Sequence, residues 1–231
     1  MNNTTATRTA DIPRRFIVFW LLSLMIPGVI LMLLRGSILG YATSALGYLV
    51  AVFAPAPVWL LIGFLQYRLL RPYLRTGLWW LLATFVGGIL GMFVGGPAMV
   101  LMMPQGEVLV LSSQSTPEWM FAQFPLLPAA FGGAIAAAIL GLSQALSLGQ
   151  GFRRGLLWFC TSVLSGALAA VCGGIAHLAY ARTMSELNPA AVEGNPAMQT
   201  IIALSIAMAV GMIVYGLLTG LIMRWILVRR T

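Results

Sequence analysis

The sequence predicts an all-α integral membrane protein with six transmembrane helices. Three observations support this prediction: a very apolar composition, six separated apolar runs and a one-sided distribution of arginine. Hydrophobic residues make up 60% of the chain and charged residues only 8%, and the mean hydropathy is +0.95. Soluble domains carry roughly 25% charged residues. So few charges cannot cover a water-exposed surface, so we expect the lipid bilayer to be the solvent.

Six apolar runs are each long enough to cross a bilayer, which takes about 20 residues of α-helix. Their approximate limits are 16–34, 44–70, 77–103, 118–148, 155–181 and 197–228. We therefore treat residues 1–231 as a single transmembrane domain, in which residues 1–15 form a cytoplasmic tail. The first run exceeds the apolar segment of a signal peptide, so we expect it to be an uncleaved span.

Prolines mark several expected helix starts and bends. Residues 116–118 (Thr-Pro-Glu) and the pair Asn195-Pro196 have the N-cap and first-turn chemistry of helix starts. Pro27 and the pair Pro55/Pro57 lie inside apolar runs, where a proline removes a backbone donor and kinks a helix. Each kink is either a packing bend or a hinge.

The arginines predict the orientation. All 13 basic residues are Arg, and threading six spans from a cytoplasmic N-terminus leaves only Arg35 and Arg182 outside. Cytoplasmic loops of membrane proteins are enriched in basic residues. Both termini are therefore expected in the cytoplasm, with the chain in a cell (inner or plasma) membrane. The net charge of +8 does not indicate nucleic acid, because the arginines form small groups between apolar runs.

An internal repeat relates residues 63–96 to residues 141–174. A shift of 78 residues aligns them without gaps, and 11 of 34 positions are identical. Each copy is a helix, a short Arg-bearing cytoplasmic turn and a second helix. A unit of two spans repeats in the same orientation, so the copies are parallel and related by an axis along the membrane normal.

The first and last spans resemble a third copy that is split between the termini. Arg15 and Trp20 have the spacing of Arg75 and Trp80. At the other end, the segment that begins at Gly220 resembles the one at Gly63. A ring of three helical hairpins, cut open inside one hairpin, would account for both similarities.

Small residues at intervals of four form stripes on three spans. A stripe of this kind lets two helix backbones approach closely, which is what holds helices together in lipid. We interpret these stripes as helix-packing surfaces, with a substrate groove as the alternative. The stripes are Gly87, Gly91 and Gly95; Gly133, Ala137 and Gly141; and Ser165, Ala169 and Gly173.

Other repeated residues are polar or amphipathic. Gln66 and Gln144 are the repeated amides, and they form either an interhelical clasp or the lining of a polar pocket. The remaining repeated pairs are interpreted as anchors at the membrane interface, where arginine and tryptophan side chains are stable. These pairs are Arg75 with Arg153 and Trp80 with Trp158.

These segments resemble uncharacterised bacterial multi-pass membrane proteins with repeated Gly-x-x-Gln, Arg and Gly-x-x-Trp segments. The resemblance covers residues 63–96, with a second copy at 141–174. The second copy departs after Gln144, where Ala-Leu-Ser-Leu-Gly replaces the Tyr-Arg-Leu-Leu-Arg that follows Gln66. The resemblance implies a bacterial inner membrane and no particular activity.

The sequence carries no recognisable catalytic or metal-binding motif. No Asp or Glu lies in the interior of a span, and His177 is the only histidine, for which we expect a structural or solvent-facing role. We therefore predict no enzyme activity and no cofactor. The leading hypothesis is a non-enzymatic structural or accessory subunit whose partners are the lipid bilayer and other membrane subunits. The alternative is a carrier or ligand-binding subunit for a neutral or lipophilic small molecule.

Overall fold

The chain folds into six α-helices over the described residues. The structure is a computed structural model, and it describes residues 12–13, 15–39, 55–74, 78–103, 125–188, 192 and 196–228. Four of the helices, α4, α7, α8 and α10, are long and apolar enough to cross a membrane. The helices are α1 (Arg15–Leu39), α3 (Pro55–Leu70), α4 (Leu78–Leu101), α7 (Leu126–Leu148), α8 (Phe152–Leu187) and α10 (Pro196–Val228).

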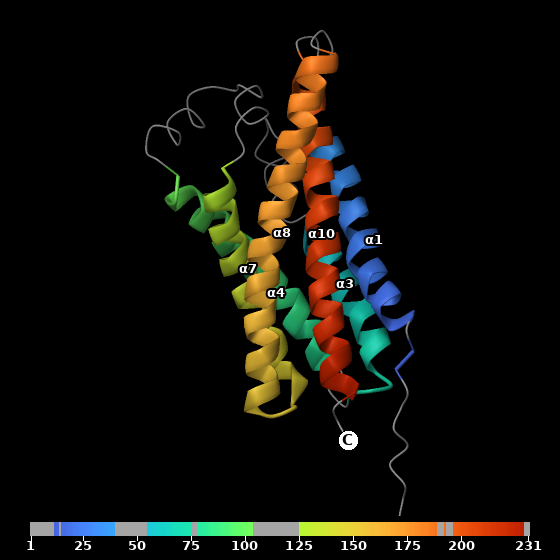
Figure 1. Cartoon of the computed structure of the whole chain (residues 1–231). Coiled ribbons are helices and arrows are strands. Elements are labelled where there is room, and N and C mark those ends of the chain that lie inside the picture. Colours follow the sequence, from blue (N-terminus) through green and yellow to red (C-terminus); the bar gives the residue numbers. More distant parts are fainter. Residues whose placement is uncertain are drawn as a thin grey trace, which may run out of the picture.

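The helices form a closed ring. Each packs against the helix before it and the helix after it in the order given above, and α10 also packs against α1. Figure 1 shows the resulting elongated bundle, in which α8 extends beyond the other helices at one end. Because the first and last helices are neighbours, the two ends of the chain complete the same ring.

The helix bounds follow the expected apolar runs, with informative differences at the prolines. Pro27 lies inside α1, and Pro196 is the first residue of α10. Pro55 and Pro57 lie in the first turn of α3, where a proline removes no intrahelical hydrogen bond, and the part of this run that precedes them lies outside the described residues. Residues 44–54 and 116–124 lie outside the described part of the chain, as does Asn195.

Two glycines shape the short turn between α7 and α8. Gly149 has a φ of 59° and ends α7 in the left-handed conformation, and Gly151 has a φ of 83° just before α8. Side-chain-bearing residues rarely adopt these angles, whereas glycine does so freely. The turn of the second repeat copy therefore needs glycine at positions 149 and 151. This need gives a physical reason why the second copy departs from the first after Gln144.

All three predicted small-residue stripes lie at helix contacts. On α4, a Cβ atom built on Gly91 would lie 2.6 Å from the Ala136 carbonyl oxygen of α7. On α7, a Cβ on Gly133 would lie 2.7 Å from the Gly166 carbonyl oxygen of α8. These backbones are therefore too close for any larger residue.

The third stripe, on α8, faces α10. A Cβ on Gly173 would lie 2.5 Å from the Ala207 carbonyl oxygen, and a Cβ on Gly211 would lie 3.0 Å from the Ala169 carbonyl oxygen. Helix α7 thus contacts α4 through one face and α8 through the adjacent face. Helix α8 contacts α10 through a different face from the one that contacts α7. Small residues therefore set the spacing of half of the ring.

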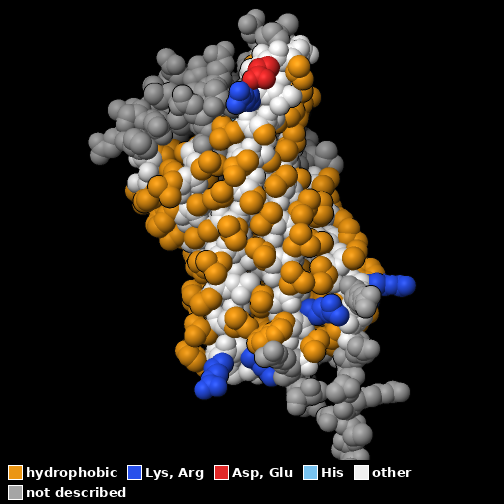
Figure 2. All heavy atoms as spheres, viewed as in Figure 1, with side chains coloured by type: hydrophobic (Ala, Val, Ile, Leu, Met, Phe, Trp, Pro, Cys, Tyr) orange, Lys and Arg blue, Asp and Glu red, His pale blue; other side chains and the backbone are white. Residues whose placement is uncertain are grey.

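The face of the molecule in Figure 2 is apolar along the bundle, with charged side chains near its ends. Arg182 and Glu186 form an exposed ion pair of 2.9 Å on the last turns of α8. The other arginines whose side chains the structure describes lie at helix ends that meet at the opposite end of the bundle, near the C-terminus (Figure 1). They are Arg15, Arg68, Arg71, Arg153, Arg154 and Arg224.

Replacing Gly91 by leucine should destabilise the bundle by about 1–3 kcal/mol, the usual cost of overpacking a close contact. The matched control is Gly96→Leu on the same helix, because Gly96 is exposed and a Cβ there meets no other atom within 4 Å. Unfolding midpoints in mild detergent measure the effect, and equal midpoints for the two variants would contradict the close packing of α4 and α7.

Candidate functional site

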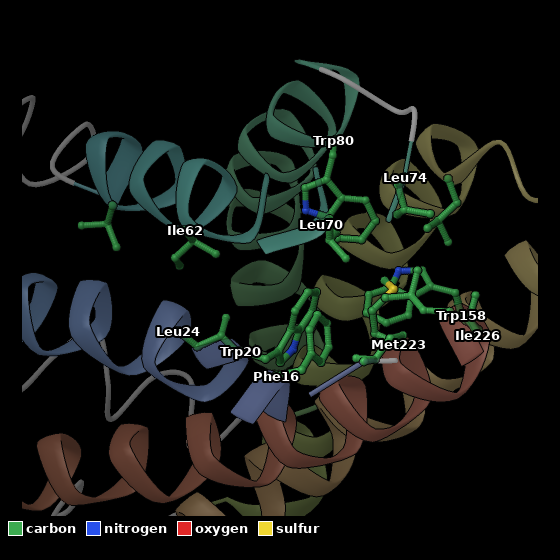
Figure 3. Close-up of a cluster of buried hydrophobic side chains, with 14 residues drawn as sticks. Phe16, Trp20, Leu24, Ile62, Leu70, Leu74, Trp80, Trp158, Met223 and Ile226 are labelled. Carbon is green, nitrogen blue, oxygen red and sulfur yellow. The ribbon is translucent and has the colours of Figure 1, made fainter. Parts of the chain in front are cut away.

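Three tryptophans meet in the interior of the ring. Trp20, Trp80 and Trp158 come from α1, α4 and α8, which are alternate helices around the ring (Figure 3). Their ring centroids are separated by 6.3, 6.0 and 5.8 Å, with the rings edge to face, and all three side chains are buried. This geometry stabilises each aromatic pair by about 0.5–1.5 kcal/mol beyond area burial. We call these residues the tryptophan cluster.

Each indole N–H of the tryptophan cluster donates a hydrogen bond to a neighbouring helix. Trp80 donates to the Gln66 side-chain oxygen of α3 at 3.3 Å, and Trp158 donates to that of Gln144 of α7 at 3.2 Å. Trp20 donates to the Thr219 hydroxyl of α10 at 3.1 Å. Bilayer hydrocarbon offers no water to these buried donors, so a side-chain acceptor is the alternative to an unpaired group.

The two glutamines also bind each other. The Gln144 amide nitrogen donates to the Thr84 hydroxyl at 2.9 Å and to the Gln66 side-chain oxygen at 3.5 Å. Gln144 thereby connects α7 with α3, α4 and α8. Both glutamines are 2% exposed. The sequence predicted that Gln66 and Gln144 form either an interhelical clasp or the lining of a pocket. In the structure both amides lie between helices, and both accept hydrogen bonds from the tryptophan cluster.

Apolar side chains pack against the tryptophan cluster. Phe16 stacks on Trp20 with ring centroids 5.8 Å apart. Leu70, Leu148 and Met223 lie on the last turns of α3, α7 and α10, and each is at most 1% exposed. The interior near the arginine-rich end is therefore filled with apolar side chains.

The structure places two of the predicted anchor tryptophans inside the ring. Trp80 and Trp158 were expected at the membrane interface, but they are buried in the ring interior. The neighbouring residue Trp79 is 72% exposed and points outward. One residue along a helix turns the side chain by about 100°, so adjacent tryptophans cannot share one environment. Of the paired arginines, Arg153 is exposed, and Arg75 lies outside the described residues.

Sequence reasoning missed the three hydroxyl residues of this site. Thr84 and Thr219 accept hydrogen bonds from Gln144 and Trp20, and both are fully buried. A signal for Thr219 was present, because Gly216-Leu-Leu-Thr219 has the spacing of Gly63-Phe-Leu-Gln66. The third hydroxyl belongs to Ser162, which is buried on α8 and donates to the Trp158 carbonyl oxygen.

His177 is completely buried on α8, so the structure excludes the solvent-facing role. No group of three His, Cys, Asp or Glu side chains able to hold a metal ion occurs among the residues that the structure describes. Cys160 and Cys172 are free thiols.

An apolar cavity of about 400 Å³ lies between α1 and α10. Its size falls within the range of small-molecule pockets. It lies closer than the tryptophan cluster to the bundle end that carries Arg182. The lining residues are Met25, Gly28, Val29, Ile202, Ser205, Ile206, Ala209 and Met212.

No protein-family model, no curated protein and no solved structure matches this chain.

Replacing Gln144 by leucine should lower stability by about 2 kcal/mol or more, because the buried Trp158 N–H loses its acceptor. Gln150→Leu is the control, since Gln150 lies in the α7–α8 turn and bonds the Arg154 guanidinium there. Detergent unfolding curves of the two variants provide the comparison. A Gln144→Leu protein as stable as the control would show that the glutamine hydrogen bonds contribute nothing.

Trp158→Phe should cost about 1–3 kcal/mol, because it removes the indole N–H and leaves the Gln144 oxygen short of a donor. Trp79→Phe should change stability by no more than about 0.5 kcal/mol, as is usual for exposed sites. Near-ultraviolet circular dichroism should lose signal only in the Trp158 variant, since coupled buried indoles give rise to it. Equal spectra for the two variants would contradict the cluster.

Proposed function

We propose that this chain is a non-enzymatic structural or accessory protein of the membrane. The observation that carries the proposal is how the buried polar side chains are used. Gln66, Gln144 and Thr219 accept hydrogen bonds from indoles of neighbouring helices. Their hydrogen-bonding capacity is thus directed to holding the ring together. This arrangement suits a rigid membrane scaffold that docks against other membrane subunits.

We infer that all six helices cross the bilayer and that the ring consists of three parallel two-helix units, one of them split between the termini. Equivalent contacts support this inference. Trp59 packs on Gly88, Ala137 on Gly166 and Met212 on Gly28, in each case where a glycine Cβ would collide. The three glycines lie eight residues after Trp80, Trp158 and Trp20, respectively.

The third unit aligns best through Gly216 rather than Gly220. A Cβ on Gly63 would approach Thr84 and one on Gly141 would approach Ser162, and a Cβ on Gly216 would approach Leu24 in the same way. Gly220 instead contacts Trp20. Four residues correspond to about one helical turn, so the alignment through Gly220 was displaced by a turn.

The proposed orientation places both termini in the cytoplasm. Six described arginines lie at the end of the bundle where α1 begins and α10 ends, while Arg182 and Arg35, the latter near the end of α1, belong to the opposite end. The positive-inside rule places the arginine-rich end in the cytoplasm. The resemblance of the Gly-x-x-Gln and Gly-x-x-Trp segments to bacterial multi-pass proteins favours a bacterial inner membrane.

A second candidate function is binding of a neutral or lipophilic small molecule. The cavity between α1 and α10 favours it, because its lining is almost entirely apolar. The one polar lining side chain, Ser205, donates to the Ile201 carbonyl oxygen of its own helix. A ligand in this cavity would be recognised through shape and apolar contact.

Accessibility of single cysteines tests the topology. After Cys160 and Cys172 are replaced by alanine, we expect Arg71→Cys and Arg153→Cys to react with a membrane-impermeant maleimide from the cytoplasmic side. Glu186→Cys should react from the outside only. Reaction of the first two cysteines from opposite sides would exclude both the parallel units and the six-span topology.

Purification in mild detergent separates the two candidate functions. The scaffold predicts reproducible co-purifying membrane chains. The ligand-binding alternative predicts a lone chain with a small molecule detected by native mass spectrometry and displaced by Ala209→Trp, which fills the cavity. Ile213→Trp is the matched control, because Ile213 lies on the same helix and outside the lining. A lone chain with no bound molecule would argue against both.

A further inference from the structure

Helices α8 and α10 meet in a fixed antiparallel register. Gly173 of α8 lies against Ala207 of α10. One turn nearer the N-terminus of α8, Ala169 lies against Gly211. Each step of four residues back along α8 corresponds to four residues forward along α10. Continuing the register by one further turn places Ser165 opposite Tyr215. The contact therefore changes there from small apolar residues to two hydroxyl-bearing residues.

Both of these hydroxyls are buried and lack a hydrogen-bond partner among the described residues. The Ser165 residue is 1% exposed. The Ser162 hydroxyl lies one turn from Ser165 and near the Tyr215 hydroxyl, without reaching hydrogen-bond geometry to it. Ser162 donates its own proton to the Trp158 carbonyl oxygen at 2.9 Å, so its oxygen remains able to accept.

Three hydroxyls of this kind provide what a buried water molecule requires. An internal water typically makes about three hydrogen bonds to polar groups that are otherwise unsatisfied. A water here can accept from Tyr215, donate to Ser162 and bond Ser165 in either sense. We propose that α8 and α10 hold an ordered water at this position, one turn from the tryptophan cluster on the side away from the arginine-rich end.

The corresponding contact between α4 and α7 explains why this site is specific to α8 and α10. There a Cβ built on Gly87 would lie 2.8 Å from the Ser143 hydroxyl oxygen and 3.1 Å from the Leu140 Cα atom. The Ser143 hydroxyl donates to the Ile139 carbonyl oxygen of its own helix, and neither Gly87 nor Leu140 carries a hydroxyl. The water at the α8–α10 contact therefore supplies hydrogen bonds that the protein itself does not offer to Ser165 and Tyr215.

Radiolytic labelling in ¹⁸O water tests the proposal on the full-length protein in detergent. Internal waters generate hydroxyl radicals in place, so a buried Tyr215 next to a bound water becomes labelled. We expect label on Tyr215, loss of that label in Ser165→Ala and its retention in Ser143→Ala. Ser143 is a suitable control because its hydroxyl donates to the Ile139 carbonyl oxygen of its own helix. An unlabelled Tyr215, or label that is insensitive to Ser165→Ala, would overturn the proposal.

A stability measurement gives an independent outcome. If a water bridges the hydroxyls, Tyr215→Phe removes one of its partners and lowers the unfolding midpoint. If the Tyr215 hydroxyl is instead buried without a partner, phenylalanine relieves that cost and raises the midpoint. A raised midpoint would therefore contradict the bound water, and a lowered midpoint together with the labelling result would support it.

Discussion

The lack of water in a bilayer interior is the constraint on which the rest of the structure depends. An indole N–H inside the helix ring has no bulk water to bond, so its partner must be another part of the protein or a water held inside the ring. In each of the three cases here, the acceptor is a side chain on the adjacent helix: Gln66, Gln144 or Thr219. The tryptophan cluster therefore combines close aromatic packing with hydrogen bonds between neighbouring helices, and it ties alternate helices of the ring to a common centre.

Close backbone approach makes this centre possible. In lipid, burial of apolar area gives little drive for helix association, so packing and hydrogen bonds must supply it. The glycine and alanine stripes bring α4, α7, α8 and α10 together until a single added Cβ would collide with a carbonyl oxygen. Short side chains on the contact faces leave room for large ones at the centre. The two features thus support each other, and weakening either should loosen the ring.

The interior and the surface point to different kinds of partner. The polar groups at the centre are largely occupied by neighbouring helices, whereas the face shown in Figure 2 is apolar along the bundle. The cavity between α1 and α10 interrupts this pattern, at the seam where the two ends of the chain meet. A seam closed by chain ends is a natural place for looser packing, because no short loop holds those helices together. The use of the buried polar groups between helices supports the proposed scaffold function, and the apolar cavity supports the alternative of binding a lipophilic molecule.

The sequence by itself determined the helical membrane class and the packing role of the small-residue stripes. Both depend on local properties, namely apolar content along the chain and spacing along one helix face. Only the tertiary structure decided where the tryptophans lie. Trp79 and Trp80 are adjacent and chemically identical, yet one faces outward and the other is buried, because the rotation of α4 in the ring sets which face is inside. The partnership of Trp20 with Thr219 likewise joins residues 199 positions apart, and ring closure alone brings them together.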